Sequence, residues 1–391
     1  MTLSERVKTV IVNPAFLLLI YVLFAIIASI QAVNNPVGPA PNGVVYTDYN
    51  NYVIFKYSFS HIVNGKPLYI LYHQEYWDLY KYSPAFALFF GLFAWLPDVI
   101  GLSLWNILNA VVLYISIRRL KLSENSKAVI LWLCLIELMT SMQNAQSNGL
   151  MAGLMILALA SMERRKIIGA TLWLVIATFI KVYAAAAFII FLFYPQKLRF
   201  IGYAALWTVL FAVVPLVVLT PVQLADQYHG WMVMMSEDRT ISYGLSVMGW
   251  LDSWFGLGNL KTFVTIAGII LFFVPLIHFR NYKDTAYQLL FLAHILIWVI
   301  IFNHKAESPT FIIAVAGAGL WYVTAPQAIW RTVIIWLVFL VTVLGHTDAY
   351  PPMLRQSIIY PYVLKVVPCI ICWIAVMYDL LLFPAKRLKY R

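Results

Sequence analysis

Twelve apolar segments dominate this sequence of 391 residues, and each is close to the length that a helix needs to cross a bilayer. A crossing takes about 20 predominantly apolar residues, and tilt or local thinning of the bilayer accommodates shorter ones. The sequence therefore predicts an all-α, polytopic membrane protein that forms one integral membrane domain over residues 1–391. The predicted crossings are approximately 14–32, 100–117, 127–142, 147–162, 167–181, 183–196, 200–219, 261–279, 285–302, 308–323, 330–345 and 361–383.

The composition supports this class, because 63% of the residues are hydrophobic and only 11% are charged. A soluble domain carries about 25% charged residues, and a disordered chain has low hydrophobicity. The three cysteines, Cys134, Cys369 and Cys372, fall in apolar runs and are expected to be buried packing residues rather than a disulfide framework or a zinc site. Arg6 and Lys8 precede the first apolar run as in a signal peptide, but eleven further segments favour an uncleaved anchor.

The net charge of +11 indicates an orientation, because membrane proteins concentrate Lys and Arg in cytoplasmic loops. All the basic clusters fall on one side only if the apolar stretch at 84–97 does not cross. That stretch has proline near each end and spans about 14 residues, which suits an interfacial or re-entrant helix. Both termini are then expected in the cytoplasm, and the basic excess does not indicate a nucleic-acid partner. The clusters are Arg6/Lys8, 118–121, 164–166, Lys197/Arg199, Arg280/Lys283, Arg331 and 386–391.

This topology leaves two long segments on the outer side, residues 33–99 and 220–260. In the first, Tyr52, Phe55, Phe59 and Ile62 recur at helical spacing and predict a juxtamembrane helix that ends before Gly65. A second short run, 73–80, leads into the proline-bounded stretch. The sequence contains neither a Walker loop nor a Gly-rich nucleotide fingerprint.

Polar side chains at membrane depth are costly and mark functional sites, and here they gather on the predicted outer side. Several outer turns that are distant in sequence carry them, which predicts one aqueous cavity that opens outward. These residues are Asp48, Glu137, Gln143, Gln146, Asn148, Lys181 with Tyr183, Glu237-Asp238-Arg239, His304, Lys305 and Glu307.

Each of these residues also has a structural interpretation. Asp48 is a favourable N-cap for the helix that follows it. Asn and Gln in tight turns commonly satisfy backbone groups, and Lys181 has the length to reach the outer headgroups. A lone histidine such as His304 is commonly structural, although a turn that also holds Lys305 and Glu307 is harder to dismiss.

A carboxylate beside several cations fits glycosyl transfer from a phosphate leaving group. The carboxylate would deprotonate an acceptor hydroxyl, and the cations would stabilise charge that develops on the departing phosphate. No GxSxG elbow or HExxH motif points to hydrolysis instead. Because nucleotide sugars are not available outside the membrane, a lipid-phosphate sugar is the expected donor, with its lipid held by the interfacial helices.

Six sequence elements resemble those of membrane glycosyltransferases of the GT-C superfamily, and more narrowly of glycosyltransferase family 87, the polyprenyl-phosphate-mannose-dependent alpha-mannosyltransferase-like proteins. They follow the family order over about residues 10–325. The elements are Asp48-Tyr49-x-x-Tyr52, Gly65-x-Pro67-Leu68-Tyr69, Tyr82-x-Pro84, Gln143-x-x-Gln146-Ser147-Asn148-Gly149-Leu150, the Lys181 turn and His304-x-x-Glu307-Ser308-Pro309.

The resemblance implies a GT-C-like fold and an inverting, metal-independent transfer from a polyprenyl phosphate sugar to a glycan or glycolipid acceptor. It implies that Asp48 is the general base and that the Lys181 and 304–307 turns contact the donor phosphate and the acceptor. Mannose is the default sugar because the best-known members use it. Arg239 as a phosphate ligand follows from charge alone. Tyr52, Tyr82, Gln143, Gln146 and Asn148 are the remaining expected substrate contacts. We expect no cofactor, no nucleic-acid partner, and a site on the outer face of a bacterial plasma membrane.

Two other functions stay open at this stage. A secondary transporter or lipid flippase would place charged groups near the midplane and show repeated halves, and no repeat is visible here. An outer-face glycan ligase or polymerase would carry a larger outer loop rich in arginine, whereas residues 220–260 contain only Arg239.

Overall fold

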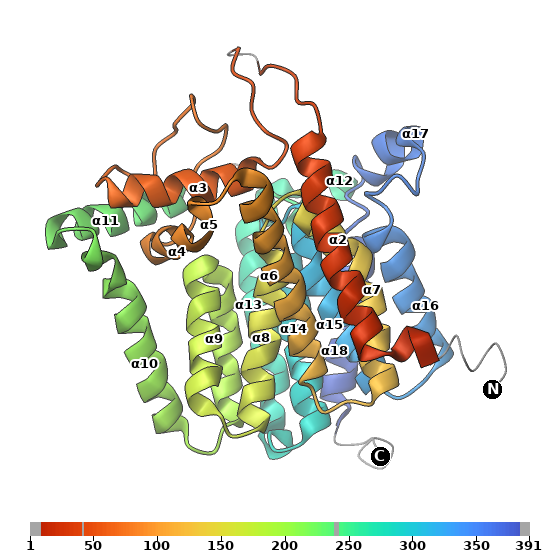
Figure 1. Ribbon diagram of the computed structural model, residues 1–391. Coiled ribbons are helices and arrows are strands. Elements are labelled where there is room, and N and C mark those ends of the chain that lie inside the picture. The colour runs from red at the N-terminus through yellow and green to blue at the C-terminus, as the bar shows by residue number, and fades with distance from the viewer. Residues whose placement is uncertain (1–8, 41–42, 238–241, 384–391) are drawn as a thin grey trace.

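The computed structural model describes residues 9–40, 43–237 and 242–383. Within these ranges the regular secondary structure is helical, apart from one isolated bridge between Pro39 and Val45, and turns and loops connect the helices. Most helices run side by side in a bundle, and shorter ones lie across one end of it (Figure 1). We call this end the capped end. Among the labelled elements α2 comes first and α18 comes last, and α18 ends at the opposite end of the bundle.

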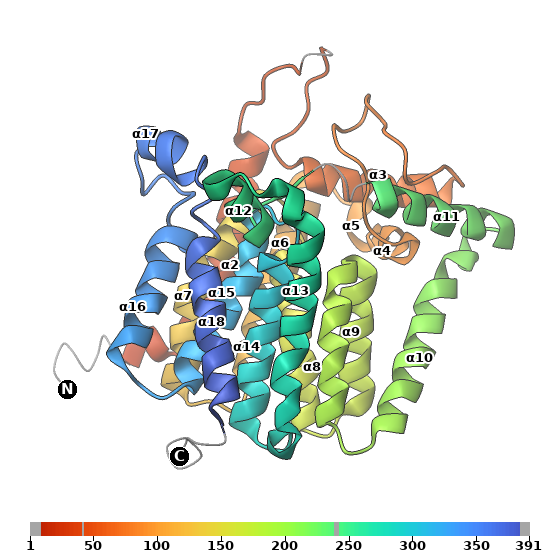
Figure 2. The same cartoon turned by 180° about the vertical axis from the view of Figure 1, so that it is seen from behind.

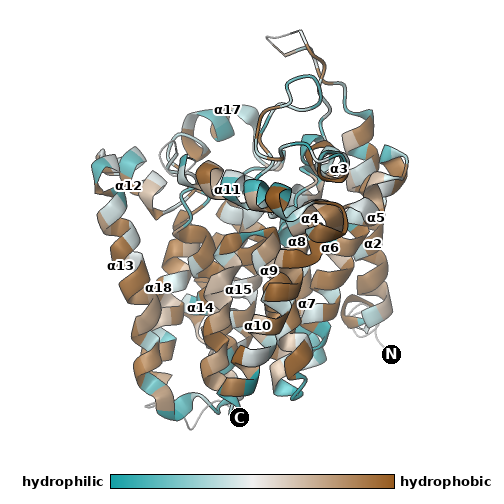
Figure 3. Cartoon of the chain, turned by 90° about the vertical axis from the view of Figure 1, so that its left-hand side faces the viewer, coloured by the Kyte–Doolittle hydropathy of each residue, from teal (hydrophilic) through white to brown (hydrophobic). Residues whose placement is uncertain are grey.

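The bundle contains a helix at each of the twelve predicted segments. Among the described residues, five helical segments have the length and apolar composition to cross a membrane. The number of crossings therefore stays a prediction. Figure 3 shows hydrophobic residues along the bundle and hydrophilic ones at its ends. The helices are α2 (Pro14–Asn34), α6 (Asp98–Arg118), α7 (Glu124–Gln143), α8 (Asn148–Glu163), α9 (Ile167–Ile180), η1 (Val182–Phe193), α10 (Lys197–Val213), η2 (Val214–Val217), α13 (Lys261–Phe273), η4 (Val274–Asn281), α14 (Thr285–Ile301), η5 (Ser308–Thr310), α15 (Phe311–Thr324), α16 (Ile329–Leu337), η6 (Val338–Val343) and α18 (Val367–Leu381).

The capped end is built from helices of the two predicted outer segments and of the connection before α18. Figure 2 shows α3, α11 and α12 at this end from behind. They are α3 (Asn50–Val63), α4 (Pro84–Phe89), α5 (Gly91–Ala94), α11 (Pro221–Glu237), α12 (Val247–Phe255), η3 (Gly258–Leu260), α17 (Pro352–Leu354) and η7 (Arg355–Ile359). The helix predicted from the spacing of Tyr52 to Ile62 is confirmed as α3, and its place beside a membrane stays a prediction.

The stretch at 84–97 forms α4 and α5, which are too short to cross a bilayer. Ser83 caps α4 by accepting a hydrogen bond from the Phe86 amide, and Pro84 occupies the first turn, where its missing N–H costs nothing. The ring of Phe55 on α3 packs edge-on against Phe86 and Phe90, with centroids 5.3 and 5.2 Å apart. Aromatic packing therefore fixes α3 over α4 and α5.

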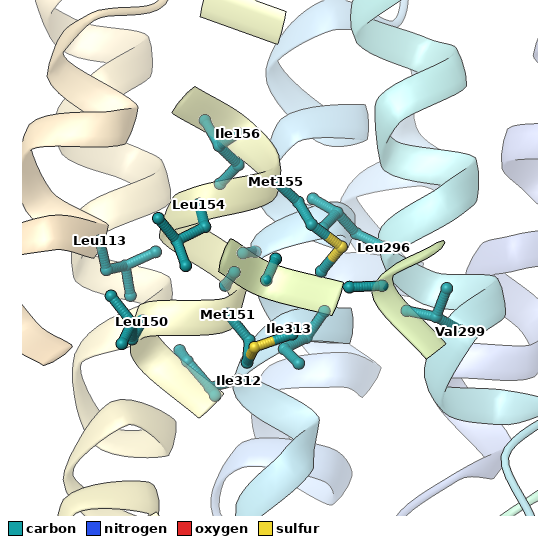
Figure 4. Close-up of a cluster of buried hydrophobic side chains, with 14 of the residues drawn as sticks. Leu113, Leu150, Met151, Leu154, Met155, Ile156, Leu296, Val299, Ile312 and Ile313 are labelled. Atoms are coloured by element: carbon teal, nitrogen blue, oxygen red, sulfur yellow. The ribbon is translucent and has the colours of Figure 1, made fainter. Parts of the chain in front are cut away.

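The core of the bundle lies between α6, α8, α14 and α15, where leucine, isoleucine, valine and methionine side chains interlock (Figure 4). Gly153 of α8 allows α6 to approach closely, because a Cβ there would lie 2.9 Å from the Leu113 amide nitrogen of α6. Residues of α10 are mostly exposed, so this helix forms an edge of the bundle.

Several details differ from the sequence analysis. The run at 73–80 forms turns rather than regular structure, and the described part of 220–260 contains α11, α12 and the short η3, none of which was foreseen. The last helix starts only at Val367. Glu137 does not face a cavity, because Lys365 binds it in a fully buried ion pair with Nζ–Oε1 2.8 Å.

At the opposite end, the basic turns at 118–121 and 164–166 are in contact. Arg164 donates to the Arg119 carbonyl over 3.0 Å, and Lys121 donates to the Glu163 carbonyl over 3.4 Å. Arg331, by contrast, is buried and ion-paired with Asp379. The three cysteines are free and buried, as expected.

Candidate functional site

A cavity of about 410 Å³ with many polar and charged lining side chains lies at the capped end, and we call it the lysine cavity. It is lined from the first outer segment, from the turns that precede α8, η1 and η5, and from α11. The structure thus brings together most of the polar turns that the sequence analysis expected to meet. The lining residues are Asn51, Ile54, Asp78, Leu79, Lys81, Tyr82, Gln146, Ile180, Lys181, Val182, Tyr183, Met235, Asn303, His304, Lys305, Glu307 and Thr310.

A chain of hydrogen bonds joins three of these turns. Lys181 Nζ donates to Asn148 Oδ1 over 2.7 Å and to Gln146 Oε1 over 3.3 Å. Gln146 Nε2 donates in turn to Glu307 Oε2 over 2.7 Å. Asn148 Nδ2 also donates to Gln146 Oε1 and to the Pro309 carbonyl. The amides of the 143–148 turn therefore position both a cation and a carboxylate, beyond satisfying their own backbone.

Lys181 points into the protein rather than toward the headgroups. It occupies the turn between α9 and η1, and its Nζ lies 5.9 Å from the centroid of the Tyr82 ring. Burial lowers the pKa of the Lys181 ammonium to about 8, although the Glu307 carboxylate acts in the opposite direction. Burial also raises the pKa of the Tyr82 phenol, and the charges of Glu307 and Asp78 add to this effect. The cavity therefore holds a desolvated cation beside a neutral phenol.

The turn that carries His304, Lys305 and Glu307 is held by the second outer segment. The Leu245 amide donates to the Ala306 carbonyl over 2.7 Å. Gly244 has a φ of +56°, and a Cβ there would lie 2.7 Å from the His304 carbonyl oxygen. Only glycine adopts this positive φ without strain and leaves room for the His304 carbonyl, so Gly244 lets the second outer segment approach this turn.

The lining residues that the sequence analysis missed include three polar ones from the first outer segment: Asn51, Asp78 and Lys81. Asp78 and Lys81 form an ion pair of 3.1 Å on the cavity wall. Asp78 and Lys81 lie in a segment of turns. Such a segment has no helical or strand periodicity that would distinguish a residue lining a cavity from one exposed to solvent. Their position in the first outer segment was the one available signal.

Asp48 lines a different cavity, of about 450 Å³, which we call the amide pocket. Its other lining residues are Gln31, Ala32, Asn34, Asn35, Gln143 and Asn144. Asp48 is exposed and accepts a hydrogen bond of 3.0 Å from Asn35 Nδ2. It does not cap α3, because Tyr49 holds the cap position and no side-chain bond is made there.

The amide pocket and the lysine cavity share a boundary. Asn51, which lines the lysine cavity, donates from Nδ2 to the carbonyl of Asn144, which lines the amide pocket, over 2.9 Å. Tyr52 lines neither, because it is buried and its hydroxyl donates to the Phe93 carbonyl. Arg239 lies outside the described residues.

An apolar groove of about 400 Å³ lies between α4, α6, α8, α9 and α10. It shares Ile180 with the lysine cavity, so the two spaces adjoin. Its lining includes Phe86, Leu154 and Trp173, and Arg119 lies where the groove nears the opposite end of the bundle. Within the described ranges, no three His, Cys, Asp or Glu side chains are grouped as metal ligands.

The sequence model of glycosyltransferase family 87 matches residues 80–344, which is more than half of the chain. The chain belongs to glycosyltransferase family 87. Together with its apolar helices, this membership makes it an integral membrane glycosyltransferase and confirms the resemblance seen in the sequence. The family 87 match includes Tyr82, Lys181 and Glu307, whereas Asp48 precedes it. No curated protein matches the chain.

Proposed function

We propose that this family 87 protein transfers a sugar, by default mannose, from a polyprenyl phosphate to a glycan or glycolipid acceptor, with inversion at the anomeric carbon. The observation that carries the proposal is the lysine cavity with an apolar groove beside it. Such a pair of spaces suits a ligand with an anionic head and a long hydrocarbon tail.

The lysine cavity provides the chemistry that a phosphate leaving group requires. Lys81, Lys181, His304 and Lys305 line it, so several donors face one space. Cations that are already in place stabilise the negative charge that develops on the phosphate as the glycosidic bond breaks. We propose that these residues do so without a metal ion, and that Arg239 adds to them.

The apolar groove provides a place for the lipid tail. Ile180 belongs to the walls of both spaces, so a chain that leaves a phosphate near Lys181 enters the groove directly. Burying isoprenoid surface there stabilises the complex by about 25 cal/mol per Å² of apolar area. A nucleotide sugar has no tail to gain from this groove.

Asp48 is the proposed general base. Its carboxylate takes the proton of the acceptor hydroxyl, and the acceptor oxygen then attacks the anomeric carbon. The bond from that carbon to the phosphate oxygen breaks, and the polyprenyl phosphate leaves with the electron pair. One displacement inverts the configuration. Because Asp48 is exposed, an acceptor has access to it.

We place the site on the outer face of a bacterial plasma membrane, with both termini in the cytoplasm. The support is the arrangement of charge: basic turns such as 118–121 and 164–166 lie at the end opposite the two cavities. Lys and Arg mark the cytoplasmic side.

The test is transfer by the full chain in lipid nanodiscs, with polyprenyl phosphate mannose, polyprenyl phosphate glucose or GDP-mannose as donor and a panel of glycolipid acceptors. Mass spectrometry of the products should show transfer from a polyprenyl phosphate sugar and none from GDP-mannose. Chelation by EDTA should leave the rate unchanged. Transfer from GDP-mannose alone would overturn the proposal.

A further inference from the structure

The amide pocket differs from the lysine cavity in its chemistry. Five of its seven lining residues are carboxamides, one is the carboxylate of Asp48, and none is a lysine or arginine. We infer that the amide pocket binds the neutral terminal sugar of the acceptor. The inference rests on the proposed function, and it says where the acceptor binds and to which chemical class the bound part of the acceptor belongs.

The carboxamides keep hydrogen-bonding capacity for a ligand. Gln143 Nε2 donates to Gln31 Oε1 over 3.0 Å, and Asn35 Nδ2 donates to Asp48. Asn34 and Asn144 each donate to the carbonyl four residues earlier, over 2.8 and 2.9 Å. A carboxamide has two N–H donors and an acceptor oxygen, so each retains groups that these bonds leave unused. Sugar hydroxyls both donate and accept, and they match this mixture.

The electrostatics of the amide pocket favour a neutral ligand over an anionic one. Asn34 is the last residue of α2 and Gln143 is the last residue of α7, so two helix C-termini meet at the pocket. The C-terminal end of a helix carries a partial negative charge. With the Asp48 carboxylate, both effects oppose a phosphate here, whereas the lysine cavity attracts one.

The position of the amide pocket fits the transfer. Asp48 precedes Asn51 by three residues, and Asn51 forms part of the boundary with the lysine cavity. An acceptor hydroxyl at Asp48 would therefore stand near the wall of the space that holds the donor. The donor in the lysine cavity and the acceptor in the amide pocket would then meet from neighbouring pockets of opposite electrostatic character.

The test compares three asparagines that make the same local bond. Asn34, Asn144 and Asn64 each follow or end a helix, and each donates to the carbonyl four residues earlier. Only the first two line the amide pocket. Alanine substitution therefore removes an equivalent helix-end bond in all three variants, and Asn64→Ala is the matched control.

Binding of methyl mannobioside to the full chain in nanodiscs is measured by saturation-transfer NMR, with no donor present. Asn34→Ala and Asn144→Ala should each raise its dissociation constant about two- to tenfold, the range for one lost hydrogen bond, and Asn64→Ala should not. Binding of mannose 6-phosphate should weaken in Lys181→Met and stay unchanged in Asn34→Ala. In turnover, Asn34→Ala should raise the acceptor KM and leave the donor KM unchanged.

Two results would overturn the inference: no detectable binding of the neutral glycoside to the wild-type chain, or equal binding by all three asparagine variants. Both can be distinguished from failure of the proposed function, because the binding measurement uses no donor. If the chain bound the glycoside through Asn34 and yet made no product from any lipid phosphate sugar, the inference about the amide pocket would stand and the proposed donor would be wrong.

Discussion

The lysine cavity and the amide pocket lie at the same end of the bundle and share a boundary at Asn51, yet they differ in charge and in construction. Turns far apart in the sequence form the lysine cavity, and a hydrogen-bond network holds them together. Two helix ends and one loop form the amide pocket, and its groups are more exposed. The comparison suggests that the donor half of the reaction needs a fixed array of charges, whereas the acceptor half needs accessible hydrogen-bonding groups and a base.

The largest effect should come from Asp48→Asn. This change keeps the shape of the side chain and removes the base, so kcat should fall about 10²–10⁴-fold. Fluorescence titration should find donor binding unchanged, because Asp48 does not line the lysine cavity. Asp226→Asn, on the exposed face of α11, is the control and should keep full activity. Wild-type turnover by Asp48→Asn would remove the proposed base.

The next effect concerns the support of the lysine cavity. Lys365 Nζ binds Glu137 and also Ser308 Oγ, at 2.8 Å, and Ser308 follows Glu307. Lys365→Met leaves a buried carboxylate without its cation, which should lower the free energy of unfolding by about 3–5 kcal/mol. Unfolding in SDS measures this loss.

A second variant separates charge from packing at this ion pair. Glu137→Leu combined with Lys365→Met should recover most of the stability, because an apolar pair avoids burying a charge. Lys365→Met should also raise the donor KM, since the contact to Ser308 beside Glu307 is lost, and the double variant should share this rise while its mannobioside binding is normal. A donor KM equal to that of the wild-type chain in the double variant would show that Lys365 acts on stability alone.

Lys181→Met should lower kcat about 10²–10³-fold, the usual cost of losing one group that stabilises developing charge. Rates of transfer measure it at saturating donor and acceptor. Lys66→Met is the matched control, because Lys66 is exposed in the first outer segment and does not line the lysine cavity. Equal losses in the two variants would indicate that overall charge, rather than this cavity, binds the donor.

The smallest effect is a dependence on pH. Lys181 is a cation below its pKa and neutral above it, and burial places that pKa at about 8. In the free enzyme, kcat/KM for the donor should therefore fall about tenfold per pH unit above this value. Lys181→Arg should move the fall to higher pH, because the arginine guanidinium stays charged. An unchanged alkaline limb in this variant would assign the titration to another group.

Much of the fold was predictable, because apolar length and helical spacing are local properties. A helix lies at each of the twelve predicted segments, and Tyr52 to Ile62 form the helix that their spacing predicted. The helices at 221–237 and 247–255 were missed because neither of them contains a long apolar run. Lys365 was missed because it lies inside an apolar segment and finds Glu137 only through tertiary packing, 228 residues away.

The candidate site was predicted in part, for the same reason. Charges in outer turns pointed to Gln146, Lys181 and Glu307, which the structure brings together. No feature of the sequence indicated that Asp48 and Gln143 would line a separate pocket, because the side of the membrane on which a turn lies does not reveal which other turns it contacts. The roles of all these residues stay predictions until they are tested.

The most direct test of the division between the two pockets is one kinetic comparison, of Lys181→Met with Asn34→Ala, in which donor and acceptor are each varied at fixed concentrations of the other. We predict that Lys181→Met raises the donor KM and leaves the acceptor KM unchanged, and that Asn34→Ala does the reverse. If both variants raised the same KM, the two cavities would serve one substrate, and the account would be contradicted.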